Sequence, residues 1–164
     1  MTEKDISFIQ QNRRWPFKII DIFRVLLILL PAAVLVILHS YDLYYLIAIT
    51  VISGIGLYKM YQSYFFIEYE APHGREVNFN NVISAFKQLD HTFVKTTPAY
   101  ISARSPSSMV SSGSIITVLV QDSTVLLNAR SVLGIRFGKD KDTLDIIGTI
   151  AKGEGQLNDQ DKEE

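Results

Sequence analysis

Hydrophobic residues gather in the first part of the chain, in two long runs that one short polar break separates. Residues Val25–Leu38 contain no charged side chain. Extended back to Ile19, this run has about 20 residues, the length of a helix that crosses a hydrocarbon core. The second run, Leu43–Tyr58, is also apolar all round, without the polar face of a surface helix. The pattern predicts two transmembrane helices, at about 19–38 and 43–60.

The polar break at 39–42 predicts the turn of a helical hairpin. Its backbone groups would lack hydrogen-bond partners in the middle of a bilayer, so we expect it at a membrane interface. The alternative for the first run is a cleaved secretory signal, but the run is longer than a signal core and the break lacks small residues at the cleavage spacing. Lysine and arginine flank the outer ends and are missing from the turn. This distribution predicts an integral membrane protein with both termini in the cytoplasm, in the inner membrane if the protein is bacterial.

The charged residues and the small residues in these two runs each lead to a further prediction. Asp21 and Arg24 lie one helical turn apart, where they either reach the lipid head groups or form a buried functional ion pair. A patch of small residues in the second run allows close approach of the first, where a proline precedes two alanines. The residues expected at this helix contact are Pro31, Ala32, Ala33, Ser53, Gly54 and Gly56.

Beyond the second run, the pattern changes to that of a small α+β domain. Apolar residues at helical spacing predict a helix over 81–92, capped by Asn78 or Asn80. Three extended segments follow, at 99–105, 114–121 and 124–131, and a meander is the simplest pairing for them. The residues on the helical stripe are Val82, Phe86, Leu89 and Phe93.

The middle strand is apolar on both faces, so we expect it at the centre of the sheet. The third strand alternates, which directs Val125, Leu127 and Ala129 inward and Asn128 and Arg130 to the other face. A second helix should follow, capped by Asp140 or Asp142. Its inward residues would be Leu144, Ile147 and Ile150.

The predicted fold class is therefore a membrane-anchored α+β protein. A two-helix transmembrane hairpin precedes a domain built from a helix, a three-stranded antiparallel sheet and a helix. The predicted parts are a cytoplasmic N-terminal segment (1–18), the hairpin (19–66), a cytoplasmic α+β domain (67–151) and a disordered polar tail (152–164).

Composition removes several kinds of chemistry. The formal net charge is -1 and no basic stripe is present, so we expect no nucleic-acid partner. The chain has no cysteine, which excludes thiolate metal sites and cysteine nucleophiles. His39, His73 and His91 do not stand at metal-ligand spacing, and the serine-rich loop lacks a nucleophile pattern. We expect no metal, no cofactor and no enzymatic activity.

Three arginines are the candidate binding residues. Arg104 and Arg130 lie on neighbouring predicted strands, and Arg136 lies in the loop that follows. If they converge, they can hold a phosphate, an acidic head group or a partner's carboxylates. The alternatives are solvated arginines at strand edges, or salt bridges to Asp140 and Asp142.

Residues 79–151 also invite comparison with a known family. The residues that carry the likeness are Ile101–Arg104, Ile115–Val120, Asn128–Ser131, Gly134 and Asp140. In this order, between two helices, they resemble an uncharacterised bacterial family, domain of unknown function 1499. The resemblance implies the fold of that family and no established reaction.

Two function classes follow from the sequence. The favoured one is a non-enzymatic, membrane-anchored interaction module, a small subunit or accessory protein of a membrane complex. Its expected partners are the lipid bilayer and another membrane protein, or a second copy of the chain. The alternative is a domain that binds a lipid or a small anionic ligand at the membrane surface.

Overall fold

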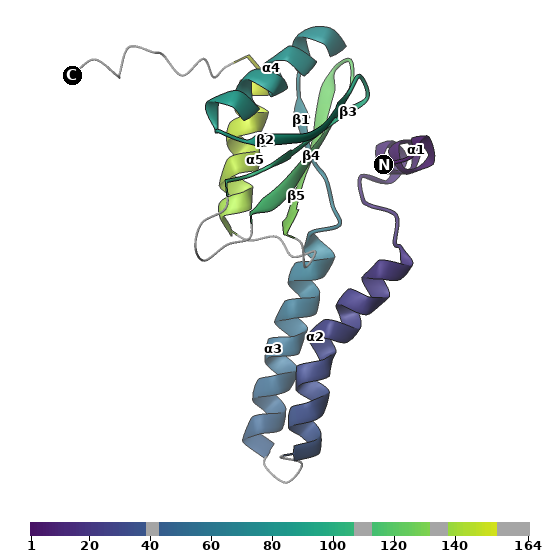
Figure 1. The fold of residues 1–164 in the computed structure, drawn as a ribbon, viewed down its shortest axis with the longest axis vertical. Helices are drawn as coiled ribbons and strands as arrows, with labels where there is room; N and C mark the ends of the chain where they lie inside the picture. Colours follow the sequence, from purple (N-terminus) through teal and green to yellow (C-terminus); the bar gives the residue numbers. More distant parts are fainter. Residues whose placement is uncertain (39–42, 107–112, 132–137, 154–164) are drawn as a thin grey trace, which may run out of the picture.

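The structure is a computed structural model that describes residues 1–38, 43–106, 113–131 and 138–153. It contains a small α+β domain from which a two-helix arm extends (Figure 1). The helices are α1 (Glu3–Asn12), α2 (Ile19–Leu38), α3 (Leu43–Gln62), α4 (Arg75–Gln88) and α5 (Gly138–Ala151). The strands are β1 (Ile67–Glu70), β2 (Thr92–Thr97), β3 (Tyr100–Arg104), β4 (Ser114–Val120) and β5 (Thr124–Ser131).

The sheet has five strands in the order β1-β5-β4-β3-β2, and every neighbouring pair is antiparallel. Strands β3, β4 and β5 form the expected meander, with the apolar strand β4 at the centre. The predicted fold class is wrong, however, because the sheet has two further strands. Strand β1 has only four residues, and β2 begins at Thr92, where helical spacing of apolar residues seemed to continue to Phe93.

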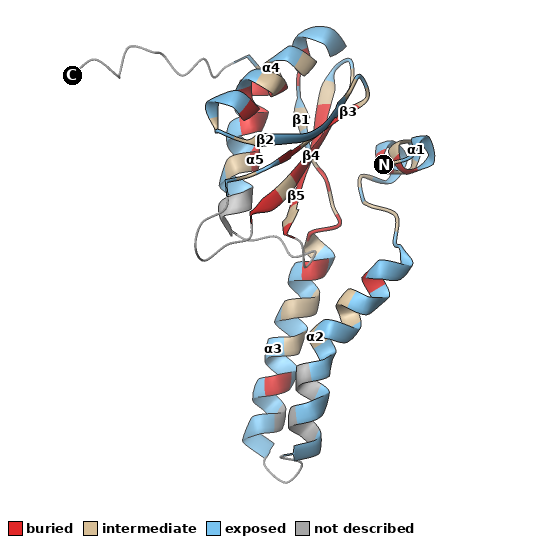
Figure 2. Ribbon diagram, in the orientation of Figure 1, coloured by how far each residue is buried: buried red, intermediate tan, exposed pale blue. Residues whose placement is uncertain are grey.

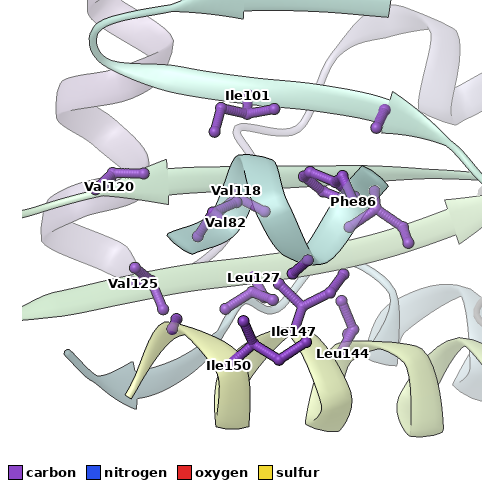
Figure 3. Close-up of a cluster of buried hydrophobic side chains, with 14 of the residues drawn as sticks. Val82, Phe86, Ile101, Val118, Val120, Val125, Leu127, Leu144, Ile147 and Ile150 are labelled. Carbon is purple, nitrogen blue, oxygen red and sulfur yellow. The ribbon is translucent and has the colours of Figure 1, made fainter. Parts of the chain in front are cut away.

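Helices α4 and α5 cover one face of the sheet and form the main core with it (Figure 3). Val82 and Phe86 of α4 are fully buried against this face. From the sheet, β5 contributes Val125, Leu127 and Ala129, the residues expected to point inward. From α5, the residues expected to point inward, Leu144, Ile147 and Ile150, are buried in the same core.

The predicted helix caps are wrong. Helix α4 begins at Arg75 after the N-cap Gly74, whose φ of 81° favours glycine. Asn78 instead lies inside the helix, where its buried amide donates to the Ala71 carbonyl at 2.5 Å and lies within reach of two carbonyls of the β4-β5 turn. Asp140 and Asp142 lie within the first turns of α5 rather than before it. The expected disordered tail lies outside the described residues beyond Gly153.

Helix α1 covers the other face of the sheet (Figure 1). It begins with a capping box, in which the backbone N–H of Asp5 donates to the Thr2 hydroxyl and that of Thr2 to the Asp5 carboxylate. Ile9 is fully buried against Leu119 and Leu126 of the sheet. The sheet is therefore covered on both faces, and the N-terminal segment is part of the domain.

Helices α2 and α3 lie side by side and form the arm, most of whose surface is exposed (Figure 2). Large apolar side chains such as Ile37 and Tyr44 are 77% and 85% exposed. In the described part of the chain, α3 alone is long and apolar enough to cross a membrane, and only 12% of its apolar window is buried. Such low burial distinguishes α3 from a core helix of a soluble protein.

The expectation of two membrane spans is therefore wrong. Asp21, near the start of α2, is only 2% exposed and belongs to the junction between arm and domain. The uncharged part of α2 begins at Val25 and covers roughly 21 Å at the rise of an α-helix, less than the thickness of a hydrocarbon core. The predicted location, an integral membrane protein with two spans and both termini in the cytoplasm, required α2 to be a span as well. This prediction is therefore wrong too.

Candidate functional site at the junction of arm and domain

A single asparagine holds the arm to the sheet. Asn128 of β5 is 1% exposed, and its Oδ1 accepts a 2.9 Å hydrogen bond from the Trp15 indole. Its Nδ2 donates to the carbonyl oxygens of Ser63 and Phe65, at 2.7 and 2.8 Å, where the chain leaves α3. Every hydrogen-bonding group of this buried amide is thus used. The segment before α2 and the segment after α3 are fixed to the same point of the sheet.

The two segments are also joined to each other. The backbone N–H of Trp15 donates to the Tyr64 carbonyl at 2.9 Å, and that of Phe66 to the Arg13 carbonyl at 2.8 Å. These bonds surround an isolated β-bridge between Arg14 and Phe65. The base of the arm is therefore closed by backbone pairing, which positions the aromatic side chains around it.

Charged side chains of β5 and α2 lie close together at the junction. The guanidinium carbon of Arg130 lies 4.4 Å from the centroid of the Trp15 ring, a cation–π contact. Arg24 pairs with Asp21 at 2.6 Å, in an ion pair whose carboxylate is buried and whose guanidinium is partly exposed. Burial lowers the pKa of Arg130, and the neighbouring charge of Arg24 lowers it further. The junction therefore holds two arginines and one aspartate.

A cavity of about 330 Å³ lies between α1, the segment that follows it, and the base of the arm. Its lining is mostly aromatic, and Arg14 is the one charged residue in it. The volume is at the small end of the range for ligand sites, about 300–1,000 Å³. The lining residues are Phe8, Arg14, Trp15, Phe17, Val25, Leu57, Met60, Tyr61, Tyr64 and Phe65.

Tyr64 connects the cavity with the charged cluster. It is 9% exposed, and its hydroxyl has no hydrogen-bond partner of normal geometry among the described residues. Burial raises the pKa of the Tyr64 hydroxyl, and the nearby Asp21 carboxylate raises it further. The hydroxyl therefore remains protonated at neutral pH, next to the Asp21 carboxylate.

The three arginines predicted as a binding site do not form one group in the described structure. Arg104 and Arg130 both pair with Ile115 across β4, so they share a sheet face but lie two strands apart, roughly 10 Å. Arg104 is exposed at the end of β3, whereas Arg130 is partly buried at the junction. Arg136 lies outside the described residues.

The residues predicted at the helix contact occupy different positions in the arm. A Cβ added at Gly56 would lie 3.1 Å from the Ile28 side chain, so this glycine does face α2. A Cβ added at Gly54 would meet nothing within 4 Å. Ala33 is exposed and Ser53 partly buried. Pro31 and Ala32 are in α2, but their side chains lie outside the described part of the structure.

Sequence reasoning missed Trp15 and Tyr64 as site residues. Trp15 is the single tryptophan of the chain and directly precedes a proline, and Tyr64 belongs to an aromatic cluster after α3. Both signals were visible, but neither indicates that the two residues lie at one site. Only the pairing of both segments with β5 brings the two side chains together.

Fold and site define a small α+β domain that carries an apolar two-helix arm, with an aromatic cavity where the two meet. Within the described residues, no group of three or more His, Asp or Glu side chains is placed to hold a metal ion. No protein-family model matches the chain, and no curated protein matches it. The function is therefore inferred from the geometry alone.

Proposed function

We propose that this protein is a non-enzymatic interaction module, anchored to a membrane by the arm that contains α3. The single observation that carries the proposal is the exposed apolar surface of the arm. Soluble monomeric proteins rarely expose contiguous apolar patches larger than a few hundred Å². Here exposed leucine, isoleucine and tyrosine side chains continue along both helices, from Ile19 to Tyr61.

The domain at the base of the arm supports the proposal that the protein is an interaction module. Strand β2 is an edge strand whose residues are mostly exposed, and Val94 on it is 56% exposed. A sheet edge of this kind offers unpaired backbone groups to another strand. The partner is a membrane protein or a second copy of this chain, so the module would act as a small accessory subunit.

Flotation of the full-length protein with phosphatidylcholine vesicles tests whether the arm anchors the protein to a membrane. Val51 on α3 and Val94 on β2 are matched for residue type and exposure, at 54% and 56%. Val51→Lys should weaken flotation strongly, because a lysine in the apolar part of a membrane helix costs about 2.5–3.5 kcal/mol. Val94→Lys should float like the unmodified protein.

The same two variants also test whether a partner binds through β2, and here Val94→Lys is the variant expected to have an effect. If a second copy pairs through β2, Val94→Lys should reduce the oligomer mass measured by light scattering in detergent, and Val51→Lys should not. Unmodified protein that stays in the soluble fraction after flotation would contradict the proposed anchoring. Equal flotation of both variants would show that the arm is not what binds.

A further inference from the structure

Strand β2 has one open side, because it is the last strand of the sheet (Figure 1). Among the described strands it pairs with β3 alone, and all its residues except Thr97 are exposed. A bulge at Val94 interrupts this pairing, so the regular part of β2 next to the β2-β3 turn is 95–97. An edge strand directs about half of its backbone N–H and C=O groups away from its neighbour, where another strand can pair with them.

A groove of about 440 Å³ lies between the regular part of β2 and the first turns of α4. Phe79 packs against the main core and gives the groove an apolar surface. Thr96 is opposite the core residue Ile101, so it faces the side of the sheet that α4 covers. The Arg75 guanidinium donates to the Pro98 carbonyl at 2.9 Å and joins the start of α4 to the β2-β3 turn. The lining residues are Arg75, Glu76, Phe79, Thr96, Thr97 and Pro98, and the two charged ones have opposite signs.

An open strand edge beside a groove under a helix is an arrangement that binds extended peptides by strand addition. Main-chain hydrogen bonds to the edge then provide affinity, and a pocket for alternate side chains provides specificity. In a strand added beside β2, the residue opposite Thr96 would direct its side chain into the groove. The residue opposite Lys95 would lie on the other face of the sheet.

Lys95 determines which residue that other face accepts. It is exposed, its Nζ lies 5.8 Å from the centroid of the Tyr100 ring, and it makes no ion pair with another described residue. The residues beside it across the sheet, Ser102 and then Thr117, are uncharged. Opposite charges on neighbouring strands attract, whereas like charges repel. A carboxylate is therefore favoured opposite Lys95, and pairing of two β2 edges is disfavoured because it would bring two lysines onto one face.

We propose that β2 and this groove bind an extended segment of a different protein by strand addition. A large apolar residue of the segment would enter the groove, and an aspartate or glutamate next to it would lie opposite Lys95. The inference rests on the proposed function, because it specifies the partner of the interaction module. It selects a partner other than a second copy of this chain.

Fluorescein-labelled threonine–valine peptides with blocked ends are suitable probes. The full-length protein in detergent micelles is titrated into each peptide, and binding is measured by fluorescence anisotropy. The first peptide has a central phenylalanine between two glutamates, so that a carboxylate meets Lys95 in either strand direction. We expect it to bind saturably. Replacing its phenylalanine by alanine should weaken binding about tenfold or more, and replacing its glutamates by lysines about threefold or more.

Two variants of the same strand test the groove. Thr96→Trp places a bulky ring where the phenylalanine of the peptide would lie, and should weaken binding of the first peptide about tenfold or more. Thr92→Trp is the matched control, because Thr92 is an exposed threonine that pairs with Arg104 and therefore lies on the other face, at the far end of β2. It should bind the peptide like the unmodified protein. Both positions are exposed, so neither variant should lower the melting temperature.

A charge reversal tests the role of Lys95. Lys95→Glu should invert the preference, so that the lysine peptide binds more tightly than the glutamate peptide. Lys87→Glu reverses the charge of another exposed lysine, in the last turn of α4, and should keep the preference of the unmodified protein.

Three results would overturn the inference. The first is the absence of saturable binding of the glutamate peptide up to about 1 mM. The second is equal binding by Thr96→Trp and Thr92→Trp, which would place the peptide outside the groove. The third is a preference for glutamate that persists in Lys95→Glu. If the peptide does not bind but Val94→Lys reduces the oligomer mass, the partner of β2 is a second copy, and this inference fails while the interaction module remains. Since none of these measurements uses vesicles, failure of membrane anchoring is also distinguishable.

Discussion

The indole Nε1 of Trp15 donates a hydrogen bond of 2.9 Å to the side chain of Asn128, joining residues that are 113 positions apart in the sequence. The same asparagine donates to two carbonyl oxygens beyond the end of α3. One buried side chain thus determines how both ends of the arm meet the sheet. Its removal tests how strongly arm and domain are coupled.

Asn128→Ala should be among the most destabilising single substitutions in the domain. It removes the hydrogen-bond acceptor of the Trp15 indole and the hydrogen bonds that Asn128 donates to two backbone carbonyls, and a buried polar group left unpaired costs about 1–3 kcal/mol. We expect the free energy of unfolding to fall by at least about 2 kcal/mol, measured by denaturant unfolding followed with Trp15 fluorescence. Ser84→Ala, at an exposed position of α4, is the control and should change little. A change below 0.5 kcal/mol, roughly the effect of an ordinary surface substitution, would show that Asn128 does not hold the junction.

Arg130→Gln should affect both stability and the surroundings of Trp15. It removes a partly buried cation–π contact, which contributes about 0.5–2 kcal/mol. We expect a fall of about 1 kcal/mol in the free energy of unfolding and a shift of the tryptophan emission. Arg130→Lys keeps the charge without the planar group and should recover part of the loss. Arg104→Gln should leave both quantities unchanged, and an equal effect at Arg104 would contradict a specific contact at Arg130.

Docking of α1 should weaken in acid. The backbone N–H of Thr2 and the side chain of Lys18, which pairs with Asp5 at 2.9 Å, hold the pKa of the Asp5 carboxyl below its usual value. A lowered pKa means that the folded state favours the carboxylate. The stabilisation is therefore complete above the ordinary carboxyl pKa, near 3.8, and is lost as the pH falls through the lower folded value.

Asp5→Asn isolates this dependence. The unmodified protein should be more stable than Asp5→Asn at pH 7, and the difference should shrink as the pH approaches 3, measured by unfolding at each pH. The opposite trend, with the difference growing in acid, would mean that the folded state favours the protonated carboxyl.

Gly148 should tolerate no side chain while Tyr69 is present. A Cβ at Gly148 of α5 would overlap the Tyr69 ring of β1, whereas a Cβ at Gly54 would meet nothing within 4 Å. Gly148→Ala should therefore destabilise the domain by about 1–3 kcal/mol, the usual cost of overpacking, and Gly54→Ala should not. In the double variant Gly148→Ala with Tyr69→Ala, the loss of stability should be smaller than the sum of the losses in the two single variants, because the overlap is gone. Strict additivity would exclude this contact as the cause.

The central part of the domain was predictable because its pattern is local. Alternation in β5 placed Leu127 on the core face and Asn128 on the other, and both positions agree with the structure. Helical spacing likewise identified the buried residues of α5. The spacing misled at Phe93, where one apolar residue fitted the helical stripe of α4 but belongs to β2. Tertiary pairing with β3 decided that position, and no local signal contains it.

The candidate site was largely invisible in the sequence for the same reason. Arg130 was recognised, but as a member of a group with Arg104 and Arg136, because neighbouring strands suggested convergence. Its contacts instead come from Trp15 and from the start of α2, far away in the chain. For Asp21 and Arg24, the sequence allowed either contact with lipid head groups or an ion pair with each other. The structure has the ion pair, with Asp21 buried at the junction. Long-range placement of polar residues is what periodicity cannot supply.

The contact between the N-terminal segment and β5 has a consequence for the order of events during synthesis. Helix α1 and Trp15 are translated before β5, the strand on which they dock, which is completed only at Ser131. Contacts between such distant residues form late, because a long loop must close first. We therefore expect the sheet and its helices to assemble before the N-terminal segment docks, at a stage when the apolar arm has already left the ribosome. Cotranslational capture of that arm, by a bilayer or by a chaperone, would precede the last step, in which the N-terminal segment closes over the finished sheet.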